Sequence, residues 1–344
     1  MSKIKLSILF IFIVINNYAQ EVMPYERNIE NIENYNFYQY KVLQGEENFN
    51  LCGTLITPKN SYDKIVIIVP GSGKDTRNSH FLLTQHLLDN NIAVFRYDER
   101  GVGLSEGKYS NQMYTISNMI NDLAYVYDYL KTDTMFVGRK IGLLGHSQGG
   151  LVTIGSIEKG LKCDFLIQWA TPVQRTKDFL KYQIKTGVNK QEKTLNYSNA
   201  EMKFIVMDSI QKIIDNNNKL DDLSLIKTIY TSLKKYNYKK DDYGWYVSYP
   251  FYLDLLRKDY TSTYKNIDIP TLYIIGDNDI YVDPNENINL LKTFNNEKIS
   301  YNVFKMLNHY LNHYDLKQAN ATMYEIDTDA KVLISNWITN NYQF

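Results

Sequence analysis

Short apolar runs rich in β-branched residues alternate with helical stretches along most of this chain. The strand-like runs cover residues 64–69, 93–97, 140–144, 165–169, 271–275 and 300–304. The helical stretches cover residues 81–88, 116–130, 150–159 and 327–337. Strands that are apolar on both faces and separated by helices are typical of a parallel sheet with helices on both sides. The sequence therefore predicts an α/β fold with a mostly parallel central sheet.

Two regions depart from this alternation. Residues 38–42 and 49–56 flank the polar segment 45–48, which predicts an N-terminal hairpin. Residues 173–268 contain no convincing central strand and are polar and rich in Lys and Asn. This profile predicts a helical cap inserted into the sheet, since the strand pattern resumes after it.

The first residues form a separate piece. Two lysines precede a run at residues 6–15 that is apolar apart from Ser7, and a polar stretch containing Ala19 follows. This order is typical of a secretory signal peptide, and the run is too short to cross a bilayer. We expect a signal peptide at residues 1–19 and an exported, periplasmic or secreted domain at 20–344. No cysteine stands directly after the apolar run, where a lipid could be attached. We therefore expect no stable membrane anchor after cleavage.

Composition excludes several classes of protein. The 38 basic and 38 acidic side chains give a formal charge of zero, and no basic stripe predicts a nucleic-acid partner. The two cysteines, Cys52 and Cys163, are too few for a zinc ribbon. They could pair with each other, but buried free thiols are the favoured state. The 30 tyrosines mostly reflect a compositional bias. No motif predicts a metal or another cofactor.

The strongest motif is Gly-His-Ser-Gln-Gly at residues 145–149, between a predicted strand and a predicted helix. In this context G-x-S-x-G forms a nucleophile elbow. The turn is so tight that side chains at positions 145 and 149 would collide with their neighbours. Ser147 is then held at the N-terminal end of a helix, where free amides and the helix dipole favour negative charge. The motif predicts Ser147 as a nucleophile.

A serine hydroxyl needs a base to act as a nucleophile. After a nucleophile elbow of this kind, the acid comes next along the chain and the base comes last. Only His309 and His313, of five histidines, lie beyond Ser147. We favour His309, which comes soon after the last predicted strand in a loop, and His313, one helical turn further on, is the alternative. The acid should lie in the loop after strand 271–275. Asp279 is favoured because the preceding turn lets its carboxylate reach the histidine.

Two neighbouring aspartates are weaker candidates for the acid. Asp277 is adjacent to the Gly turn and suits a loop or capping role, and Asp283 lies further along the loop. For the oxyanion hole, the motif predicts the amide of Gln148 and an amide from the loop after strand 64–69. Small residues occupy that loop, and we expect Ser72 to be the second donor.

Two glycine-rich segments resemble nucleotide-binding loops, but each lacks residues that the motif requires. Residues 71–74 read Gly-Ser-Gly-Lys, but a Walker A motif needs glycine where Ile68 stands and Ser or Thr where Asp75 stands. Residues 101–105 lack the third glycine of a dinucleotide loop. The sequence therefore predicts neither a P-loop nor a dinucleotide site.

The motifs together resemble the α/β-hydrolase superfamily. Within it the chain is similar to exported bacterial hydrolases of the Hydrolase_4 (serine aminopeptidase S33-like) and dienelactone-hydrolase-like families. The resemblance runs over roughly residues 62–310 and includes segments 69–73, 96–105, 145–150, 269–279 and 307–309. It implies Ser147, Asp279 and His309 as the catalytic triad. It also implies structural roles for Asp98 and Arg100, in the turn after the second parallel strand.

The chain departs from these relatives at two positions. Lys74 stands where many have proline in the oxyanion loop, and Gln148 stands where many have Glu after the nucleophile. The backbone amide of Gln148 is unaffected. Substrate specificity should lie in the cap, where residues 236–252 are rich in aromatic side chains. Trp245 is our candidate for a wall of the acyl pocket, against ordinary packing within the cap.

The first functional hypothesis is a serine esterase acting on small acyl esters without a cofactor. The alternative is a peptidase or amidase that uses the same triad on short peptides. That activity needs an anchor for a peptide terminus, for which Asp241 and Asp242 in the cap are candidates. The third hypothesis is a silent binding protein that keeps the fold, and the complete Ser, Asp and His set argues against it. The sequence does not indicate the natural substrate or the oligomeric state.

Overall fold

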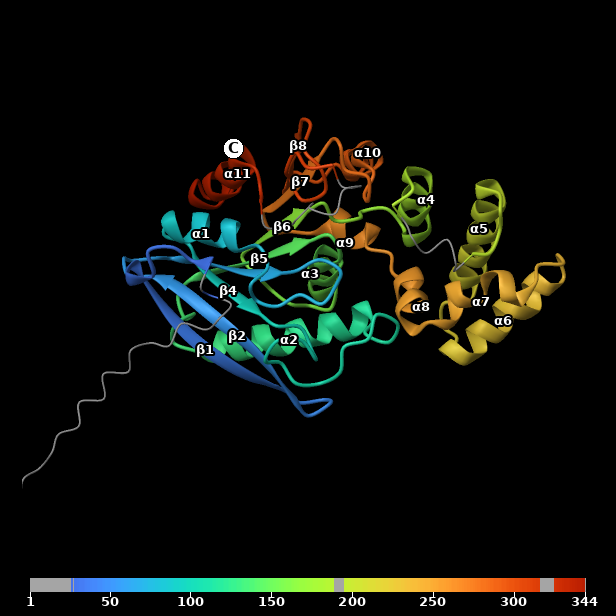
Figure 1. Cartoon of the computed structure of the whole chain (residues 1–344), viewed down its shortest axis with the longest axis horizontal. Helices are drawn as coiled ribbons and strands as arrows, with labels where there is room; N and C mark the ends of the chain where they lie inside the picture. Colours follow the sequence, from blue (N-terminus) through green and yellow to red (C-terminus); the bar gives the residue numbers. More distant parts are fainter. Residues whose placement is uncertain (1–25, 27, 189–194, 316–324, 344) are drawn as a thin grey trace, which may run out of the picture.

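The computed structural model describes residues 26, 28–188, 195–315 and 325–343. The expected signal peptide, residues 1–19, lies outside this part of the chain. One sheet of eight strands forms the centre of the molecule (Figure 1), in the order β1-β2-β4-β3-β5-β6-β7-β8. Its strands are β1 (Tyr35–Gln44), β2 (Phe49–Pro58), β3 (Lys64–Val69), β4 (Ala93–Tyr97), β5 (Lys140–His146), β6 (Phe165–Trp169), β7 (Thr271–Gly276) and β8 (Ile299–Phe304).

The strand directions agree with the sequence prediction. β1 and β2 form an antiparallel hairpin, β2 pairs antiparallel with β4, and every other neighbouring pair is parallel. β3, β4, β6 and β7 are buried along their whole length, as expected for apolar strands covered on both faces. The chain therefore has an α/β fold whose parallel strands end at one common edge.

Helices cover both faces of the sheet (Figure 1). α1 (Phe81–Asp89) and α11 (Thr328–Thr339) pack together on one face, and α2 (Ile116–Thr132) and α3 (Gln148–Glu158) pack together on the other. α9 (Thr261–Asn266) contacts α3 and α10 (Pro284–Phe294), and α10 precedes β8. A short 3-10 helix, η2 (Ile32–Asn34), leads into β1.

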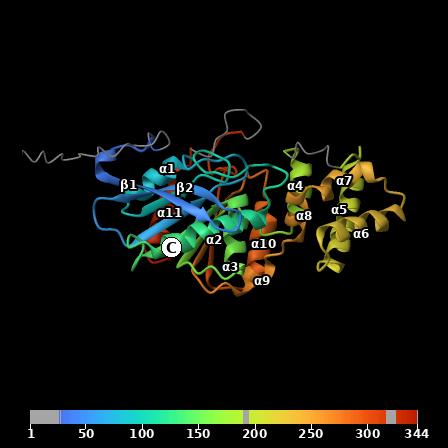
Figure 2. The same cartoon turned by 90° about the horizontal axis from the view of Figure 1, so that it is seen from below.

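The segment between β6 and β7 is helical in the part that the structure describes. Its first described helices are α4 (Thr176–Thr186), α5 (Ala200–Asn216), α6 (Asp222–Lys234), α7 (Lys240–Ser248) and α8 (Pro250–Arg257), and α9 follows them before β7. We call α4–α8 the cap segment. Figure 2 shows it as a group of helices to one side of the sheet. Asn199 and Asp221 cap α5 and α6 with their side chains, and each helix buries one apolar face.

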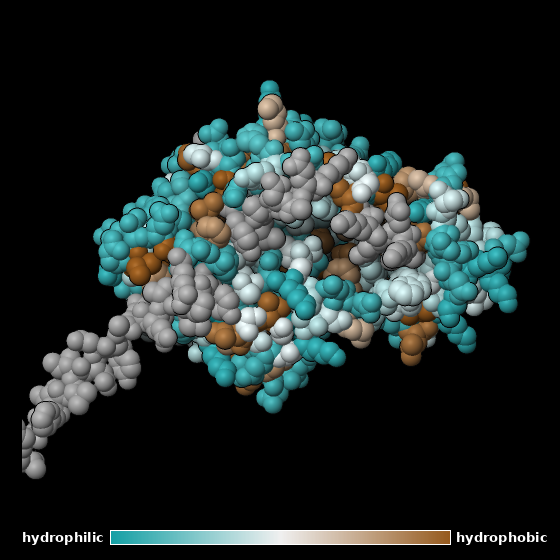
Figure 3. Space-filling model, viewed as in Figure 1, coloured by the Kyte–Doolittle hydropathy of each residue, from teal (hydrophilic) through white to brown (hydrophobic). Residues whose placement is uncertain are grey.

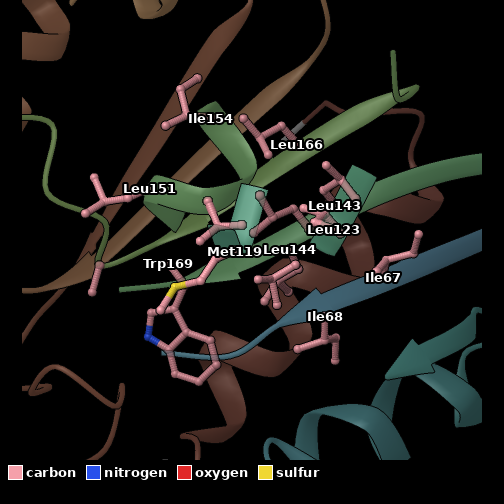
Figure 4. Packing of buried hydrophobic residues seen from close by; sticks show 14 of the residues in the cluster. Ile67, Ile68, Met119, Leu123, Leu143, Leu144, Leu151, Ile154, Leu166 and Trp169 are labelled. Atoms are coloured by element: carbon pink, nitrogen blue, oxygen red, sulfur yellow. The ribbon is translucent and has the colours of Figure 1, made fainter. Parts of the chain in front are cut away.

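A continuous apolar core fixes the strands that carry the candidate site. Figure 4 shows Ile67 and Leu143 of adjacent strands on the same side of the sheet as Leu123 of α2, with Ile68 and Trp169 on the opposite side. All five side chains are buried. Because such cores are close-packed, the ends of β5 and β6 are rigid supports for the residues that follow them.

Candidate active site

Ser147 lies on the predicted elbow between β5 and α3. Its backbone has φ 53° and ψ −116°, a strained conformation for a residue with a side chain. A Cβ at Gly145 would lie 2.5 Å from the carbonyl oxygen of Gly149, and a Cβ at Gly149 would lie 2.2 Å from that of Val69. The Ser147 amide donates to the carbonyl of Trp169 at 2.8 Å, which ties the elbow to β6. The turn therefore requires glycine at both positions.

Asp279 and His309 are in direct contact. The Nδ1 atom of His309 lies 2.7 Å from Oδ2 of Asp279. The other carboxylate oxygen, Oδ1, accepts hydrogen bonds from the amides of Tyr281 and Val282 at 2.7 and 2.9 Å. The hydroxyl of Tyr182 donates to the Asp279 carbonyl at 2.7 Å. A carboxylate held in this way keeps the proton of neutral His309 on Nδ1, which leaves Nε2 free to accept a proton.

The loop that carries His309 is fastened to the strands beside Ser147. The His309 carbonyl accepts a hydrogen bond from the indole Nε1 of Trp169 at 3.1 Å, and lies 3.3 Å from Nε2 of His146. The rings of His146 and His309 are 5.0 Å apart. Since Trp169 also accepts the Ser147 amide, one residue of β6 contacts both loops. The structure thus brings Ser147, His309 and Asp279 to the same edge of the sheet.

The alternatives that the sequence left open have other partners. Asp277 accepts the amide of Met306 at 2.6 Å. Asp283 caps α10 by accepting two amides of its first turn. The side chain of His313 is 63 % exposed and lies 3.5 Å from Asp327. Asp277 and Asp283 therefore support the loop and the helix, and His313 lies at the surface. This leaves Asp279 and His309 as the better candidates for the acid and the base.

The two residues expected to form an oxyanion hole line one pocket of about 280 Å³. Gly71 brings the loop after β3 close to the elbow, because a Cβ there would lie 3.6 Å from Cβ of Ser147. In the described part of the chain, no hydrogen bond occupies the amides of Ser72 and Gln148. Gln148 is also the first residue of α3, where free amides favour an anion.

The cap contributes aromatic side chains to this pocket, but Trp245 is not among them. Its indole is 57 % exposed and packs edge-on against Tyr249 at 5.5 Å. Phe251 and Tyr252 lie in the wall where Trp245 was expected. The other lining residues come from the loop after β3, the loop before α2, and helices α2 and α3: Ser72, Gly73, Tyr109, Ser110, Asn111, Tyr114, Met119 and Gln148.

Buried charges support the loops around the site. Arg77 and Asp98 form an ion pair at 2.7 Å, and Arg100 pairs with Asp122 at 2.6 Å. Asp98 also accepts the amides of Arg77 and Leu104. These contacts give Asp98 and Arg100 structural roles in the turn after β4, as expected.

Asp75 and Glu99 are two buried carboxyl groups near the oxyanion loop. The amide of Asp75 donates to Glu99 at 3.3 Å. Burial raises the pKa of Asp75 to about 6, and burial also raises the pKa of Glu99 well above its usual range. Both carboxyls therefore disfavour the ionised state in the folded protein.

The described residues hold neither a metal cluster nor a helix suited to span a membrane. No cluster of three or more His, Cys, Asp or Glu side chains there is arranged to hold a metal ion. Among the described helices, none has the length and apolar content of a membrane span. On the face seen in Figure 3, apolar residues are scattered among hydrophilic ones. Cys52 and Cys163 are both free thiols.

The sheet order, the strained serine turn and the Asp–His contact after β7 and β8 define an α/β-hydrolase. The family model Hydrolase_4, described as serine aminopeptidase, S33, matches residues 60–314, and the chain belongs to this family. No curated protein matches the sequence at a significant level.

Solved structures share the fold at low sequence identity. The esterase Pf2001 of Pyrococcus furiosus is 18 % identical, with a TM-score of 0.54 over 89 % of this chain and 90 % of that one. The esterase EaEST of Exiguobacterium antarcticum is 15 % identical, with a TM-score of 0.52 over 89 % and 99 %. Proline iminopeptidase of Mycobacterium smegmatis is 12 % identical, with a TM-score of 0.55 over 89 % and 99 %. The protein is thus a hydrolase of this superfamily.

Proposed function

We propose that the protein is a serine esterase that cleaves carboxylic esters through an acyl-enzyme. Ser147 attacks the acyl carbonyl while Nε2 of His309 accepts its proton, and Asp279 orients and stabilises the imidazolium. The amides of Ser72 and Gln148 bind the oxyanion. His309 then gives the proton to the leaving alcohol. In the second half of the reaction water attacks the acyl-enzyme while His309 takes its proton, and Ser147 leaves with that proton as the acid is released.

The observation that carries the ester assignment is the absence of charge in the pocket beside Ser72 and Gln148. Every described side chain that lines it is neutral. An aminopeptidase must hold the ammonium group of its substrate beside the scissile carbonyl, and burying that cation without a carboxylate is costly. Asp241 and Asp242 of α7 do not line the pocket. A neutral acyl group fits this lining better than an amino acid residue.

A peptidase or amidase is the second candidate. The family description and the similarity of the fold to a proline iminopeptidase favour it. A catalytically silent binding protein is the third candidate. The contact between His309 and Asp279 and the strained elbow at Ser147 argue against it, because a silent protein has no need of either.

The test compares p-nitrophenyl butyrate with the p-nitroanilides of alanine and proline, using the purified protein and its Ser147→Ala variant. We expect ester hydrolysis, fluorophosphonate labelling of Ser147, and loss of both in the variant. Removing a triad member leaves about 10³–10⁴-fold catalysis over water. Anilide hydrolysis at a higher kcat/KM would establish the peptidase. Labelling without turnover of any substrate, or no labelling at all, would contradict the esterase.

We also propose that the chain is exported and cleaved near Ala19. The support is the order of lysines, apolar run and small residue at the N-terminus. The test is to express the full chain in a bacterium, fractionate the cells and sequence the N-terminus of the product. A product that begins at Met1 and stays with the cytoplasm would refute the proposal.

A further inference from the structure

The pocket beside the oxyanion amides has a wall that is fastened to the core. The Phe251 amide at the start of α8 donates to the Gln112 carbonyl at 2.9 Å. One helical turn further on, the carboxylate of Asp254 accepts both the amide and the hydroxyl of Ser117, at 2.9 and 2.6 Å. Lys258 donates to the same hydroxyl at 2.7 Å. These bonds hold α8 against α2, so the pocket keeps its size unless they break.

The size and lining of this pocket limit the acyl group. A volume of about 280 Å³ lies just below the roughly 300–1,000 Å³ that is usual for small-molecule pockets, so the pocket suits a small group. Four of its walls are aromatic rings, from Tyr109, Tyr114, Phe251 and Tyr252. Building on the esterase function, we propose that the enzyme takes compact, neutral acyl groups such as hexanoyl or benzoyl, and excludes long-chain fatty acyl groups.

The test is a series of p-nitrophenyl esters: butyrate, hexanoate, benzoate and laurate. We expect hexanoate and benzoate to be hydrolysed well, and kcat/KM for laurate to be about 30-fold below hexanoate, since overfilling a fixed pocket costs about 1–3 kcal/mol. Phe251→Ala should narrow the gap between laurate and hexanoate by about tenfold. Tyr236→Ala, a change of a cap aromatic that is 71 % exposed, is the matched control and should leave the ratio unchanged.

The outcomes separate this inference from the function on which it rests. Labelling of Ser147 together with equal hydrolysis of laurate and hexanoate overturns the size limit and leaves the esterase intact. A Phe251→Ala variant with the selectivity of the original protein also overturns it, because the wall would then be elsewhere. No labelling and no ester hydrolysis would overturn both.

A different observation carries a second inference. Three of the five histidines form a buried row behind the elbow. Nδ1 of His80 lies 3.1 Å from the hydroxyl of Ser79, Nε2 of His80 lies 3.2 Å from Nδ1 of His146, and Nε2 of His146 lies 3.3 Å from the carbonyl of His309. Trp169 packs against the rings of both His80 and His146.

The carbonyl of His309 at the end of this row decides which atom donates each hydrogen bond. A carbonyl only accepts, so Nε2 of His146 must carry the hydrogen, and in a neutral ring its Nδ1 must then accept. Nε2 of His80 is therefore a donor, and its Nδ1 accepts from Ser79. Burial lowers the pKa of His80 to about 3 and that of His146 well below its usual range, so both rings are neutral.

We infer that His80 and His146 are positioning residues for the esterase. Each ring donates to the next, and His146 donates to the main-chain carbonyl of His309. Asp279 holds the imidazole of the same residue at Nδ1. His80 touches no reacting atom and acts through His146 alone. Its loss would leave Nδ1 of His146 without a donor and loosen the His309 carbonyl.

The test uses a pair of variants at the same left-handed backbone position, where His80 has φ 58°. His80→Gln keeps an N–H near the place of Nε2, and His80→Phe keeps a ring but no donor. We measure kcat per active site, counted by the endpoint of fluorophosphonate labelling. For His80→Phe we expect kcat to fall about tenfold to a hundredfold with KM nearly unchanged, because a displaced base costs about that much.

The Gln variant should recover most of this loss. If both variants only melt at lower temperature and keep the original kcat per labelled site, the row of histidines has a packing role and the inference is overturned. It is also overturned if His80→Gln and His80→Phe lose kcat equally, since the donor would then be irrelevant. Failure of Ser147 to react in the unmodified protein would instead overturn the esterase itself.

Discussion

Replacing Asp279 by Asn tests the candidate triad with little change in shape. In the folded protein Oδ1 of Asp279 accepts two amides, from Tyr281 and Val282, and Oδ2 faces Nδ1 of His309. The amide oxygen of Asn must take the place of Oδ1. The opposite orientation would set its NH₂ group against two buried N–H donors, at about 1–3 kcal/mol for each group left unpaired.

That orientation turns the Asn NH₂ group toward His309. The imidazole must then accept at Nδ1 and carry its hydrogen on Nε2, where it cannot take the proton of Ser147. We expect kcat to fall about 10⁴-fold, which is roughly 5 kcal/mol of transition-state stabilisation. KM should change little, because Asp279 is buried behind the histidine.

The assay is the initial rate with p-nitrophenyl butyrate, on protein shown to be folded by its melting transition. Asp277→Asn in the same loop is the matched control. Its amide oxygen can still accept the Met306 amide, so its rate should stay within about twofold of the original. A rate above one-tenth of the original in Asp279→Asn would refute the triad geometry, and a large loss in Asp277→Asn would transfer the role to that residue.

Three further predictions concern stability and the cap. The raised pKa of Asp75 means that its folded state binds the proton more tightly, so its contribution to stability is present below pH 4 and is lost as pH rises through about 6. Asp75→Asn should therefore raise the melting temperature at pH 8 and leave it nearly unchanged at pH 4. Gly149→Ala should cost about 3 kcal/mol or more in urea unfolding and abolish labelling of the serine, because the new Cβ would lie 2.2 Å from the Val69 carbonyl oxygen. Trp245→Ala should leave kcat/KM for short esters within about twofold, since its indole is largely exposed, and a tenfold loss would return it to the pocket wall.

The parallel strands could be predicted closely because both of their faces are buried. The run at 64–69 coincides with β3, and the run at 165–169 coincides with β6. The outer hairpin was less well bounded. β1 extends from Tyr35 to Gln44, beyond the predicted 38–42, because one face of this edge strand is exposed and its polar residues hide the pattern.

The candidate triad could be found from the order of motifs, but the cap aromatics could not be placed by composition alone. α7 buries Tyr243, Tyr246 and Val247, which follow the i, i+3, i+4 spacing of one helix face. Trp245 is two positions from Tyr243 and therefore points to solvent. Phe251 belongs to α8, a separate helix that begins at Pro250, and its direction depends on how that helix docks on α2. The sequence predicts which face of α7 is buried, but it does not predict how α8 packs on α2.

The row of histidines behind the elbow was invisible to sequence reasoning for a related reason. His80 and His146 are 66 residues apart, and the parallel pairing of β3 with β5 brings the loop after β3 to the end of β5. The elimination that leads to His309 sets His80, His86 and His146 aside because they precede Ser147. Chain order predicts which histidine would take the proton, but it carries no information about what holds that histidine in place.

The distinction between ester and peptide hydrolysis has the same physical origin. The elbow and the Asp–His contact depend on strand ends that any member of this fold can supply, so they determine the reaction and leave the substrate open. Under the proposed function, charge in the pocket beside Ser72 and Gln148 decides between the two substrates. That pocket draws half of its aromatic walls from the cap segment, through Phe251 and Tyr252. A cap that presented a carboxylate at either position could hold an ammonium group, and the same triad would then act on an amino-terminal residue.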